Sequence, residues 1–528
     1  MASGLIIPGV QVTVVKEVLP QQLAPSGVLG LIGFTERAEQ TEQNTLKVTR
    51  AGSWSRYVEV LGRGSAYSLP EARQALDNGV SELVISPLPA NAGAIARTAL
   101  AGDESKAKAF RALLDKAVRD TTAAAEDAKR KRDALKANAG ADPVVVKAAE
   151  DTYTEAKARL DQATAAQTAG SDITNDKAGL TLMARAPGPW ANGLIVRVAY
   201  RDNIDQSISF DLQVLRRVAG SEEILEMYRG QTLASFVSTL KGSSFVKVDE
   251  SKATGWPKAE EYTLGGGQDA SAADYTAALE RLRDEADVDM VLAAVQDFSD
   301  LTKVARVYGA VISHCNAMSD ECKGRIGFGQ VPKTGAPDTH AQLASNLVSD
   351  RFVLVAPNGV VGAVTGVVGN LPYFHSPTFK RLSGLADLPP ISTEDQKALL
   401  RGNVVPVVLE RGRGTIVLRG LTTDGDQINV RRVADRSVRM LKMIGDLFIG
   451  LLNNADGRTA LKQKLVEALV QMEKDGAIVP STDGKDPSFK VEVYSSQADF
   501  ALGIVRVNMA VRPVRAIDYI YATITVQV

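Results

Sequence analysis

Cysteine, histidine and tryptophan are scarce in this sequence, with 2, 3 and 3 residues among 528. Two cysteines cannot form a disulfide framework, so the fold must be stabilised by packing, which fits a reducing compartment. Three histidines leave little material for a transition-metal site or for general base catalysis. Neither sign of charge is in excess, since 61 basic and 62 acidic side chains give a formal net charge of -1. This balance argues against a protein that mainly binds nucleic acid or an anionic membrane surface.

Long hydrophobic runs are also missing. No segment reaches about 18 consecutive apolar residues, the length that a membrane-spanning helix needs. The first residues contain no basic stretch, and Pro8 and Gly9 interrupt the apolar run, so we expect neither a signal peptide nor membrane insertion. Hydrophobic residues make up 45% and charged residues 23% of the chain, which are ordinary values for a folded protein.

The common motifs of catalysis and phosphate binding are absent as well. No HExxH or GxSxG pattern occurs in the sequence. Residues 327–334 resemble a phosphate loop, but no glycine directly precedes Lys333. Pro332 also removes a backbone N–H that a phosphate cradle needs. We therefore reject a phosphate-binding loop at this position.

Histidine and cysteine come together at one place only, where His314, Cys315 and Cys322 could supply three metal ligands. No fourth ligand has the spacing of a metal site, so an incidental buried cluster is the favoured interpretation. His340 and His375 lie in Gly- and Pro-rich surroundings and are predicted to be loop residues and not bases. The sequence therefore predicts no catalytic residue, no metal, no cofactor and no enzymatic activity.

Alternating strand and helix patterns indicate a mixed α/β fold. Residues 28–34 form a buried strand candidate, Pro70 begins a helix that Gly79 ends, and residues 82–86 form the next strand. This order is typical of an α/β layer. Further strands are predicted at residues 194–200, 207–214, 290–295, 351–357, 403–408 and 415–419, and a helix at 272–284.

Residues 103–168 are rich in Ala, Lys, Glu, Asp and Arg and carry few large apolar side chains. They are predicted to form two helices, 103–138 and 144–168, with Pro143 at the start of the second. We interpret them as a protruding antiparallel helical hairpin. The basic cluster at 129–132 is flanked by acidic residues, so a solvated face is favoured over a nucleic-acid patch or a docking arm.

Two amphipathic helices are predicted in the last hundred residues, at 431–452 and 458–475. In the second helix, an apolar stripe recurs at helical spacing, and the opposite face is polar. The apolar stripe consists of Leu461, Leu465, Leu469 and Met472, and the polar face of Arg458, Lys462, Lys464, Glu467 and Lys474.

Both ends of the sequence have the alternation of β-strands, in residues 10–15 at one end and in 504–512 and 517–528 at the other. The members that share one face are Val10, Val12 and Val14 near the first residue, and Ile520, Ile524 and Val526 near the last. Such strands either pair within their own subunit or extend a sheet of a neighbouring copy. The residues alone favour pairing within the subunit.

An ordered series of segments is recognisable along the chain. It opens with Ile7-Pro8-Gly9-Val10-Gln11-Val12 and continues with residues 29–36 (LGLIGFTE) and 67–85. A Pro-Gly-x-Trp-x-Asn turn at 187–192 and LGGGQDA at 264–270 follow. The strongest stretch, 403–433, contains Gly412-Arg413-Gly414 and Asn429-Val430-Arg431-Arg432-Val433, and the series closes with 503–528. In this order the segments resemble the contractile tail sheath family of bacteriophages and related contractile injection particles.

The resemblance implies a structural protein that stacks in rings of six around an inner tube and contracts to drive the tube through a target cell envelope. Each subunit would lend its two terminal strands to neighbouring copies, which reverses the choice made from the residues alone. Implied partners are further copies of the chain, the inner tube, and baseplate and tail terminator proteins, with no direct nucleic acid and no membrane insertion. A non-contractile tail or capsid component acting as a binding module is the alternative function.

The resemblance also implies a domain plan and a location. The plan comprises a strand arm and linker at 1–25, an outer α/β region at 26–350 with the hairpin 103–168, an inner core at 351–512, and a second strand arm at 513–528. Linkers that can rotate are expected at 21–27 and around 512–516. The polar face of the helix 458–475 is the candidate contact with the inner tube, because exposed ion pairs break easily; a solvated face is the alternative. The implied location is a virion tail assembled in the bacterial host cytoplasm, or else a cytoplasmic or released injection particle.

Overall fold

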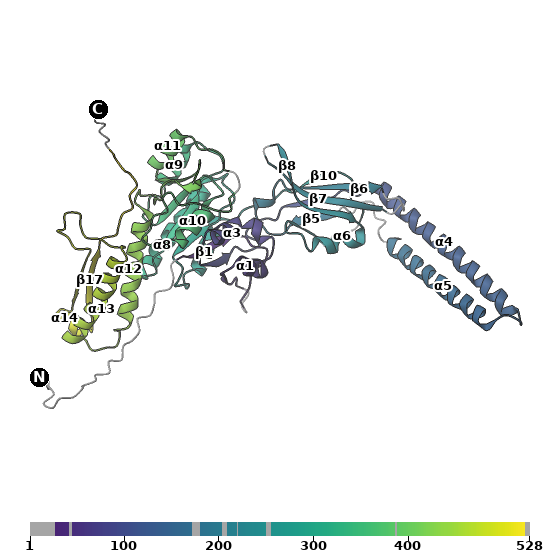
Figure 1. Ribbon diagram of the computed structural model, residues 1–528, viewed down its shortest axis with the longest axis horizontal. Helices are drawn as coiled ribbons and strands as arrows, with labels where there is room; N and C mark the ends of the chain where they lie inside the picture. Colours follow the sequence, from purple (N-terminus) through teal and green to yellow (C-terminus); the bar gives the residue numbers. More distant parts are fainter. Residues whose placement is uncertain are drawn as a thin grey trace, which may run out of the picture.

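The structure is a computed structural model that describes residues 27–41, 45–171, 180–202, 208–218, 220–249, 255–385 and 388–522. The molecule is elongated (Figure 1). A large sheet with its helices lies in the middle, a C-terminal lobe lies at one end, and an outer lobe ending in a helical hairpin extends the other way. The expected mixed α/β fold with several substructures is confirmed.

The central sheet has eight strands in the order β15-β14-β13-β12-β11-β1-β3-β2. The pairs from β14 through β3 are parallel, whereas β15 and β2 add antiparallel edges. Parallel strands buried on both faces consist of continuous apolar runs. The bounds are β1 Val28–Gly33, β2 Thr49–Ala51, β3 Glu82–Pro87, β11 Met290–Ala293, β12 Ile326–Gln330, β13 Phe352–Ala356, β14 Val404–Glu410 and β15 Gly414–Val417. β12 and β13 are adjacent, so the expected boundary at 350/351 falls inside this sheet.

Helices cover both faces of the central sheet (Figure 1). On one face, the first core cluster joins the sheet to α1 Trp54–Leu61, α3 Pro70–Asp77 and α10 Val361–Asn370, with the short α2 Ser65–Ser68 between α1 and α3. On the other face, the second cluster joins it to α7 Ala272–Arg281, α8 Leu301–Asp320, α9 Pro337–Ser345 and α11 Thr393–Arg401. The helices predicted from Pro70 and at 272–284 are therefore present.

The contact between α3 and α10 is unusually close because α10 carries glycines on the facing side. A Cβ atom at Gly362 would lie 2.6 Å from the Glu71 carbonyl oxygen, and one at Gly366 would lie 2.7 Å from that of Ala75. Residues Val361–Gly369 of α10 are all buried. This close packing places the side chain of Glu71 inside the core.

The Glu71 carboxyl group is poorly partnered for a buried acid. Its Oε2 has no hydrogen-bond partner among the described residues, and its Oε1 lies 3.5 Å from Gln330 Nε2. Burial raises the pKa of Glu71 to about 7 from an ordinary value of 4.5. Because the folded-state pKa is the higher one, the stability contributed by this group is full below pH 4.5 and is lost as pH rises through about 7.

Replacing Glu71 tests whether its buried carboxyl group has a raised pKa. We expect Glu71→Gln to raise the free energy of unfolding at pH 8 by ~2–3 kcal/mol and to change it little at pH 4, where the wild-type carboxyl is already neutral. Urea unfolding at both pH values measures this difference. Glu59→Gln is the control, because the Glu59 side chain is 69% exposed. A Glu71→Gln protein with the pH dependence of the wild type would contradict the assignment.

The outer lobe contains two small sheets, with strand orders β10-β6-β7-β8 and β4-β5-β9. Their strands are β4 Arg97–Ala99, β5 Thr181–Ala184, β6 Ile195–Asp202, β7 Ile208–Val218, β8 Ser221–Gln231, β9 Val246–Val248 and β10 Glu261–Thr263, and α6 Leu233–Leu240 packs beside them. β6 and β7 confirm the strands predicted there, and β8 was not predicted.

The hairpin is present and consists of α4 Glu104–Ala137 and α5 Pro143–Ser171. Within α4, only Ala125 and Ala128 are buried, so small side chains form the contact with α5. At its base, Phe110 packs edge-on against Trp256 with ring centroids 5.3 Å apart. The hairpin is thus joined to the outer lobe at one end and projects from it (Figure 1).

The C-terminal lobe consists of α12 Ile428–Asp446, α13 Ala455–Lys474, β16 Phe489–Tyr494, α14 Gln497–Ala501 and β17 Arg506–Val511. The predicted apolar stripe of α13 is confirmed, because Leu461, Leu465, Leu469 and Met472 are its buried residues. The helix predicted at 431–452 begins three residues earlier and ends six residues earlier than expected. The helix ends at Asp446, and the backbone then turns towards Gly450, whose φ is +84°.

Three further sequence predictions are settled by the structure. The glycines of the rejected phosphate loop lie in a strand, since Gly327 and Gly329 are in the middle of β12 and leave room for Phe352. His340 was predicted in a loop and lies in α9, which Pro337 begins. The strand predicted at 517–528 is not present up to residue 522, and residues 523–528 lie outside the described range.

Candidate subunit interface

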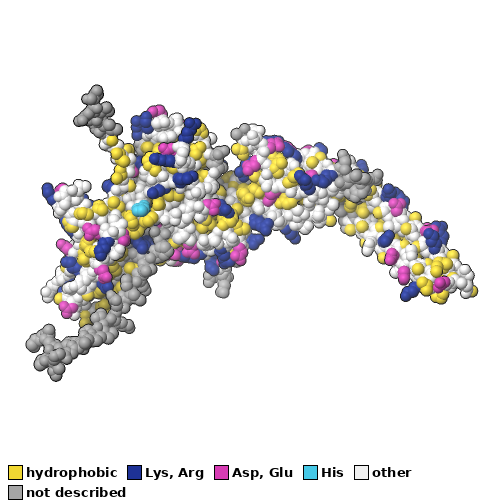
Figure 2. All heavy atoms as spheres, viewed as in Figure 1, with side chains coloured by type: hydrophobic (Ala, Val, Ile, Leu, Met, Phe, Trp, Pro, Cys, Tyr) yellow, Lys and Arg dark blue, Asp and Glu magenta, His cyan; other side chains and the backbone are white. Residues whose placement is uncertain are grey.

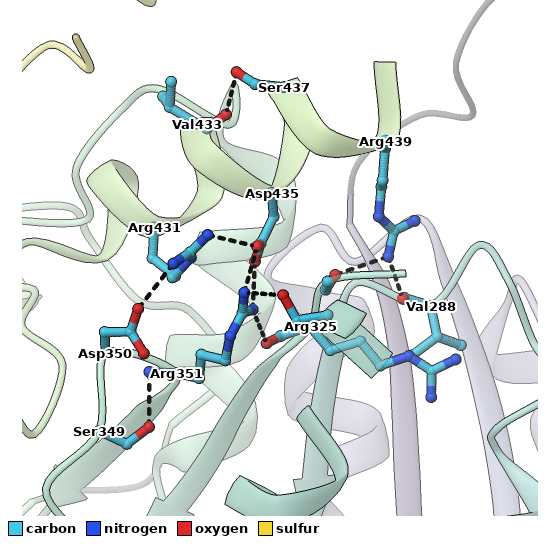
Figure 3. A network of polar contacts seen from close by, with 12 residues as sticks. Val288, Arg325, Ser349, Asp350, Arg351, Arg431, Val433, Asp435, Ser437 and Arg439 are labelled. Carbon is cyan, nitrogen blue, oxygen red and sulfur yellow. Dashed lines mark hydrogen bonds and ion pairs between the residues drawn. The ribbon is translucent and has the colours of Figure 1, made fainter. Parts of the chain in front are cut away.

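Helix α12 connects the C-terminal lobe to the central sheet through a buried ion network (Figure 3). Arg351, at the start of β13, donates from its two Nη atoms to the two carboxylate oxygens of Asp435 at 3.0 and 2.9 Å. The Asp435 carboxylate also accepts from Arg431 at 3.0 Å, one helical turn earlier. Arg431 in turn binds Asp350 at 2.8 Å. A bidentate, nearly buried pair of this kind fixes the orientation of the helix as well as its position.

A second contact of α12 reaches the strand ends of the central sheet. Arg439 donates to the carbonyl oxygens of Val288 and Gly324, at 2.6 and 2.9 Å, just before β11 and β12 begin. Both carbonyl groups belong to residues that lie two positions before a parallel strand. Arg431, Asp435 and Arg439 recur at intervals of four residues, so one stripe of α12 faces the sheet.

The opposite side of α12 packs against the rest of the C-terminal lobe. Val433, Met440 and Ile444 form an apolar cluster with the buried stripe of α13 and with residues of β16 and β17. β16 and β17 pair with each other in antiparallel register, and no third strand of the described chain joins them. A two-stranded sheet is marginally stable by itself, and each of its strands has one unpaired edge.

The five residues predicted on the polar face of α13 differ in their exposure to solvent. Lys464, Glu467 and Lys474 lie on the side opposite to the buried stripe, and Lys464 pairs with Glu467 at 3.0 Å. Lys462 is also exposed, at the other edge of the solvent side of the helix. Arg458 is only half-exposed, and its Nη1 donates to Asn453 Oδ1 at 2.8 Å. The exposed face is therefore formed by four of the five residues.

The predicted strand residues at the chain ends fall in two groups. Val10, Val12, Val14, Ile524 and Val526 lie outside the described residues. Ile520 is described and is 84% exposed. Its neighbours Tyr519 and Tyr521 are 62% and 94% exposed. Figure 2 shows hydrophobic side chains along this projecting segment up to its grey end.

Two of the turns singled out in the sequence contact each other where the outer lobe meets the central sheet. Asn192 Oδ1 accepts from the Gly267 backbone N–H at 2.8 Å, and Asn192 Nδ2 donates to the Gly267 carbonyl oxygen at 2.9 Å. A Cβ atom at Gly267 would lie 2.4 Å from the Gly188 carbonyl oxygen, so only glycine fits. The turns at 187–192 and 264–270 thus form one joint.

This joint occupies the place where α/β proteins commonly bind ligands, at the carboxyl ends of the strands where the strand order reverses. Here the reversal lies between β1 and β11. Gln296, just after β11, accepts from the Trp190 N–H at 3.3 Å and donates to the Ser68 carbonyl oxygen at 2.6 Å. The Asp269 carboxylate accepts from the Gln296 N–H at 3.2 Å. Loops of this chain therefore occupy the carboxyl ends of the strands at the point where the strand order reverses.

His314, Cys315 and Cys322, the candidate metal ligands, are not arranged to bind one metal ion. His314 shares a hydrogen bond with Arg325 at 2.8 Å, and burial together with this cation lowers the pKa of His314 to about 4. Burial raises the pKa of the Cys315 thiol to about 12. No group of three or more His, Cys, Asp or Glu in the described part of the chain is placed to hold a metal ion. No helix among the described residues is long and apolar enough to cross a bilayer.

Sequence reasoning missed Arg351 and Asp435, which are 84 residues apart and carry no local pattern. It also missed the exposed apolar side chains at the tip of the C-terminal lobe. These are Leu447, Ile449, Leu451, Leu452, Phe500 and Leu502. The sequence did contain a sign of this exposed apolar surface. The predicted helix included residues 447–452, and one helix could not bury all the apolar side chains of that segment.

No protein-family model matches the sequence, and no curated protein matches it. Among solved structures, the chain is similar to a sheath tail protein from Desulfitobacterium hafniense, with 14% identity and a TM-score of 0.45 over 92% of this chain and 93% of that one. It is similar to the anti-feeding prophage helical sheath in the contracted state, with 17% identity and a TM-score of 0.40 over 50% of this chain and 78% of that one. It is also similar to a contracted PVC sheath complex of an extracellular contractile injection system, with 16% identity and a TM-score of 0.39 over 45% of this chain and 71% of that one. All three of these structures are of sheath proteins or sheath complexes.

Proposed function

We propose that this chain is the structural subunit of a contractile tail sheath, which polymerises around an inner tube and contracts to drive the tube through a target cell envelope. One observation carries the proposal. The described residues beyond Asp518 are apolar and exposed, and they pair with no strand in the described part of their own subunit. An exposed run of Tyr and Ile needs a partner, and a sheet edge of another copy supplies one.

The C-terminal lobe supplies a matching acceptor. β16 and β17 each have one edge that no described strand occupies. Strands from neighbouring copies would complete this sheet by main-chain hydrogen bonds, which hold copies together while the bodies rotate. The two chain ends would then join each subunit to its neighbours.

Subunits that move as rigid bodies and stay joined by exchanged strands could contract together. Packed interfaces have discrete alternative arrangements, so a lattice of such subunits can pass from an extended to a contracted state. The formal net charge of -1 suits a protein that packs against many copies of itself, because a large like charge would oppose assembly. Rings of six, the baseplate, the tail terminator and the choice between virion and injection particle belong to the same proposal.

The exposed face of α13 is the proposed contact with the inner tube. We expect neutralising Lys462 and Lys464 with glutamine to prevent co-assembly with the tube, since the contact would lose two of its exposed cations. The free energy of unfolding should change by less than ~0.5 kcal/mol, because exposed charges contribute little to stability. Co-sedimentation with tubes measures the effect. Lys397→Gln and Lys442→Gln are control substitutions at exposed lysines on other helices, and unchanged co-assembly of the α13 variant would exclude this face.

Negative-stain electron microscopy of the purified protein tests the function as a whole. A sheath subunit is expected to form hollow tubes of stacked rings without other components. Particles that never polymerise with themselves, yet bind another tail or capsid protein, would favour a non-contractile binding module instead.

A further inference from the structure

The segment that precedes the exposed C-terminal residues is held firmly on the body, although a rotating linker was predicted around 512–516. The Val479 N–H donates to the Arg512 carbonyl oxygen at 3.0 Å, and the Val514 N–H donates to the Ala477 carbonyl oxygen at 3.0 Å. These two bonds bind the segment to the turn that follows α13. In the subunit as described, the first residues of the predicted linker are therefore hydrogen-bonded to the body.

The start of α12 holds the next residues. Asn429 Nδ2 donates to the Val514 carbonyl oxygen at 3.0 Å. Gln427 Nε2 donates to the Ala516 carbonyl oxygen at 3.0 Å, and Gln427 Oε1 accepts from the Ala516 N–H at 2.8 Å. The side-chain amide of Gln427 therefore binds the Ala516 backbone in the way that a neighbouring strand would.

Asp518 ends this attachment. Its carboxylate accepts from Arg419 Nε and from Gln427 Nε2, both at 2.8 Å, and its side chain is 6% exposed. The next three residues are the exposed ones described above. The Arg419 guanidinium still lies over the Tyr519 ring, 5.2 Å from its centroid, whereas Ile520 and Tyr521 are 84% and 94% exposed. The hydrogen-bonded attachment therefore ends at Asp518, and the chain is largely exposed from Ile520 on.

The other end of the body has a comparable attachment at Gly27, the first described residue. The Gly27 and Val28 N–H groups donate to the two carboxylate oxygens of Asp289 at 3.0 and 2.9 Å. The Gly27 carbonyl oxygen accepts from Ser81. Gly27 has a φ of +107°, and a Cβ atom there would lie 2.4 Å from the Gly369 carbonyl oxygen, so the position admits no side chain.

The two attachments share α12. Gln427 precedes the first turn and Asn429 lies in it, and both hold the C-terminal segment. Further along the same helix, Arg439 donates to the carbonyl oxygen of Val288 at 2.6 Å, directly before Asp289 in the chain. The same helix is fixed to the central sheet by the Asp435–Arg351 pair.

We propose that Asp518 and Asp289 are positioning residues that set the two points at which the chain ends leave the body, so that tension between neighbouring copies passes from both points into α12 and then into the central sheet. The ends then pivot after Asp518 and before Gly27, and not within 512–516. The part of this inference that concerns tension rests on the proposed function, whereas the attachments belong to the isolated subunit.

Amide hydrogen exchange of the purified full-length chain tests the attachments without assembly. The Val514 and Ala516 amides should exchange at least about tenfold more slowly than those of Ile520 and Tyr521, because only the former donate hydrogen bonds in the described structure. Asp518→Ala should abolish the protection at Ala516. Arg515→Ala should preserve it, because the Arg515–Asp426 pair is exposed. Equal exchange of all four amides in the wild type would overturn the inference, whether or not the protein forms tubes.

Insertions test the pivot in the assembled state. A Gly-Ser pair inserted after Asp518 keeps the hydrogen bonds of Asp518 in place and displaces only the exposed residues beyond it, so tubes should form and resist shear as in the wild type. The same pair inserted after Val514 displaces Asp518 from Arg419 and Gln427, so tubes should be absent or should break under shear. If the wild type forms tubes and both insertions have the same effect on them, the proposed pivot after Asp518 is wrong. A wild type that forms no tubes would defeat the proposed function and leave the exchange result standing.

Discussion

A chain truncated after Asp518 is expected to remain a folded subunit and to lose polymerisation completely. The truncation removes residues 519–528 and leaves every described contact of Arg512–Asp518 in place. Tyr519, Ile520 and Tyr521 are exposed, so their loss removes little buried area from the subunit itself. Size-exclusion chromatography and electron microscopy should show monomers with unchanged circular dichroism and no tubes.

A single substitution sharpens this prediction. Ile520→Pro keeps the chain length and removes one backbone N–H that a strand partner would need, so it should also prevent polymerisation. Val144→Ser is the matched control, because Val144 is likewise an exposed apolar residue, 74% exposed, but lies on the hairpin. Deletion of residues 3–18 should have the same effect as the truncation. Tubes of normal length from the truncated chain or from Ile520→Pro would contradict the role of the C-terminal strand.

Asp435→Ala is expected to destabilise the whole subunit strongly, because it leaves a buried cation without its partner. Arg351 would remain 5% exposed and lose both carboxylate bonds, and Arg431 would lose one. Removing one partner of a buried pair costs ~3–5 kcal/mol, because the other charge stays buried. Urea unfolding should show this loss.

The control for this prediction is Asp446→Ala on the same helix, which removes an exposed pair with Lys442. It should cost at most ~0.5 kcal/mol. The double variant Arg351→Met and Asp435→Leu should recover much of the stability, because an apolar pair of similar volume leaves no charge unpaired. Equal losses for Asp435→Ala and Asp446→Ala would show that the network of Figure 3 does not hold α12 to the sheet.

Periodic features of this fold were predictable from the sequence. The buried stripe of α13 and the small-residue contact of the hairpin follow from local spacing, and both appear in the structure. Continuous apolar runs such as β1 indicated buried strands, and β1 is buried throughout. The end of α12 was misplaced because apolar residues continue beyond Asp446, but those of 447–452 are largely exposed at the tip of the lobe.

The contacts that position the chain ends were not predictable in the same way. Asp289 and Gly27 are 262 residues apart, and Asp518 and Arg419 are 99 apart, so no local pattern joins them. Asp518 lies within an alternating apolar run, where a strand was predicted, and one carboxylate in such a run was the only sign of a different role. Here long-range pairing overrides local strand propensity.

The central claim is that each copy's chain ends complete a sheet of another copy. A cryo-electron microscopy map of the tubes formed by the full-length protein tests it most directly, because it can trace the chain beyond Asp518. The account predicts that residues 519–528 of each copy run as a strand beside β16 or β17 of a neighbouring copy. A map in which these residues fold back onto β16 or β17 of their own subunit would contradict it.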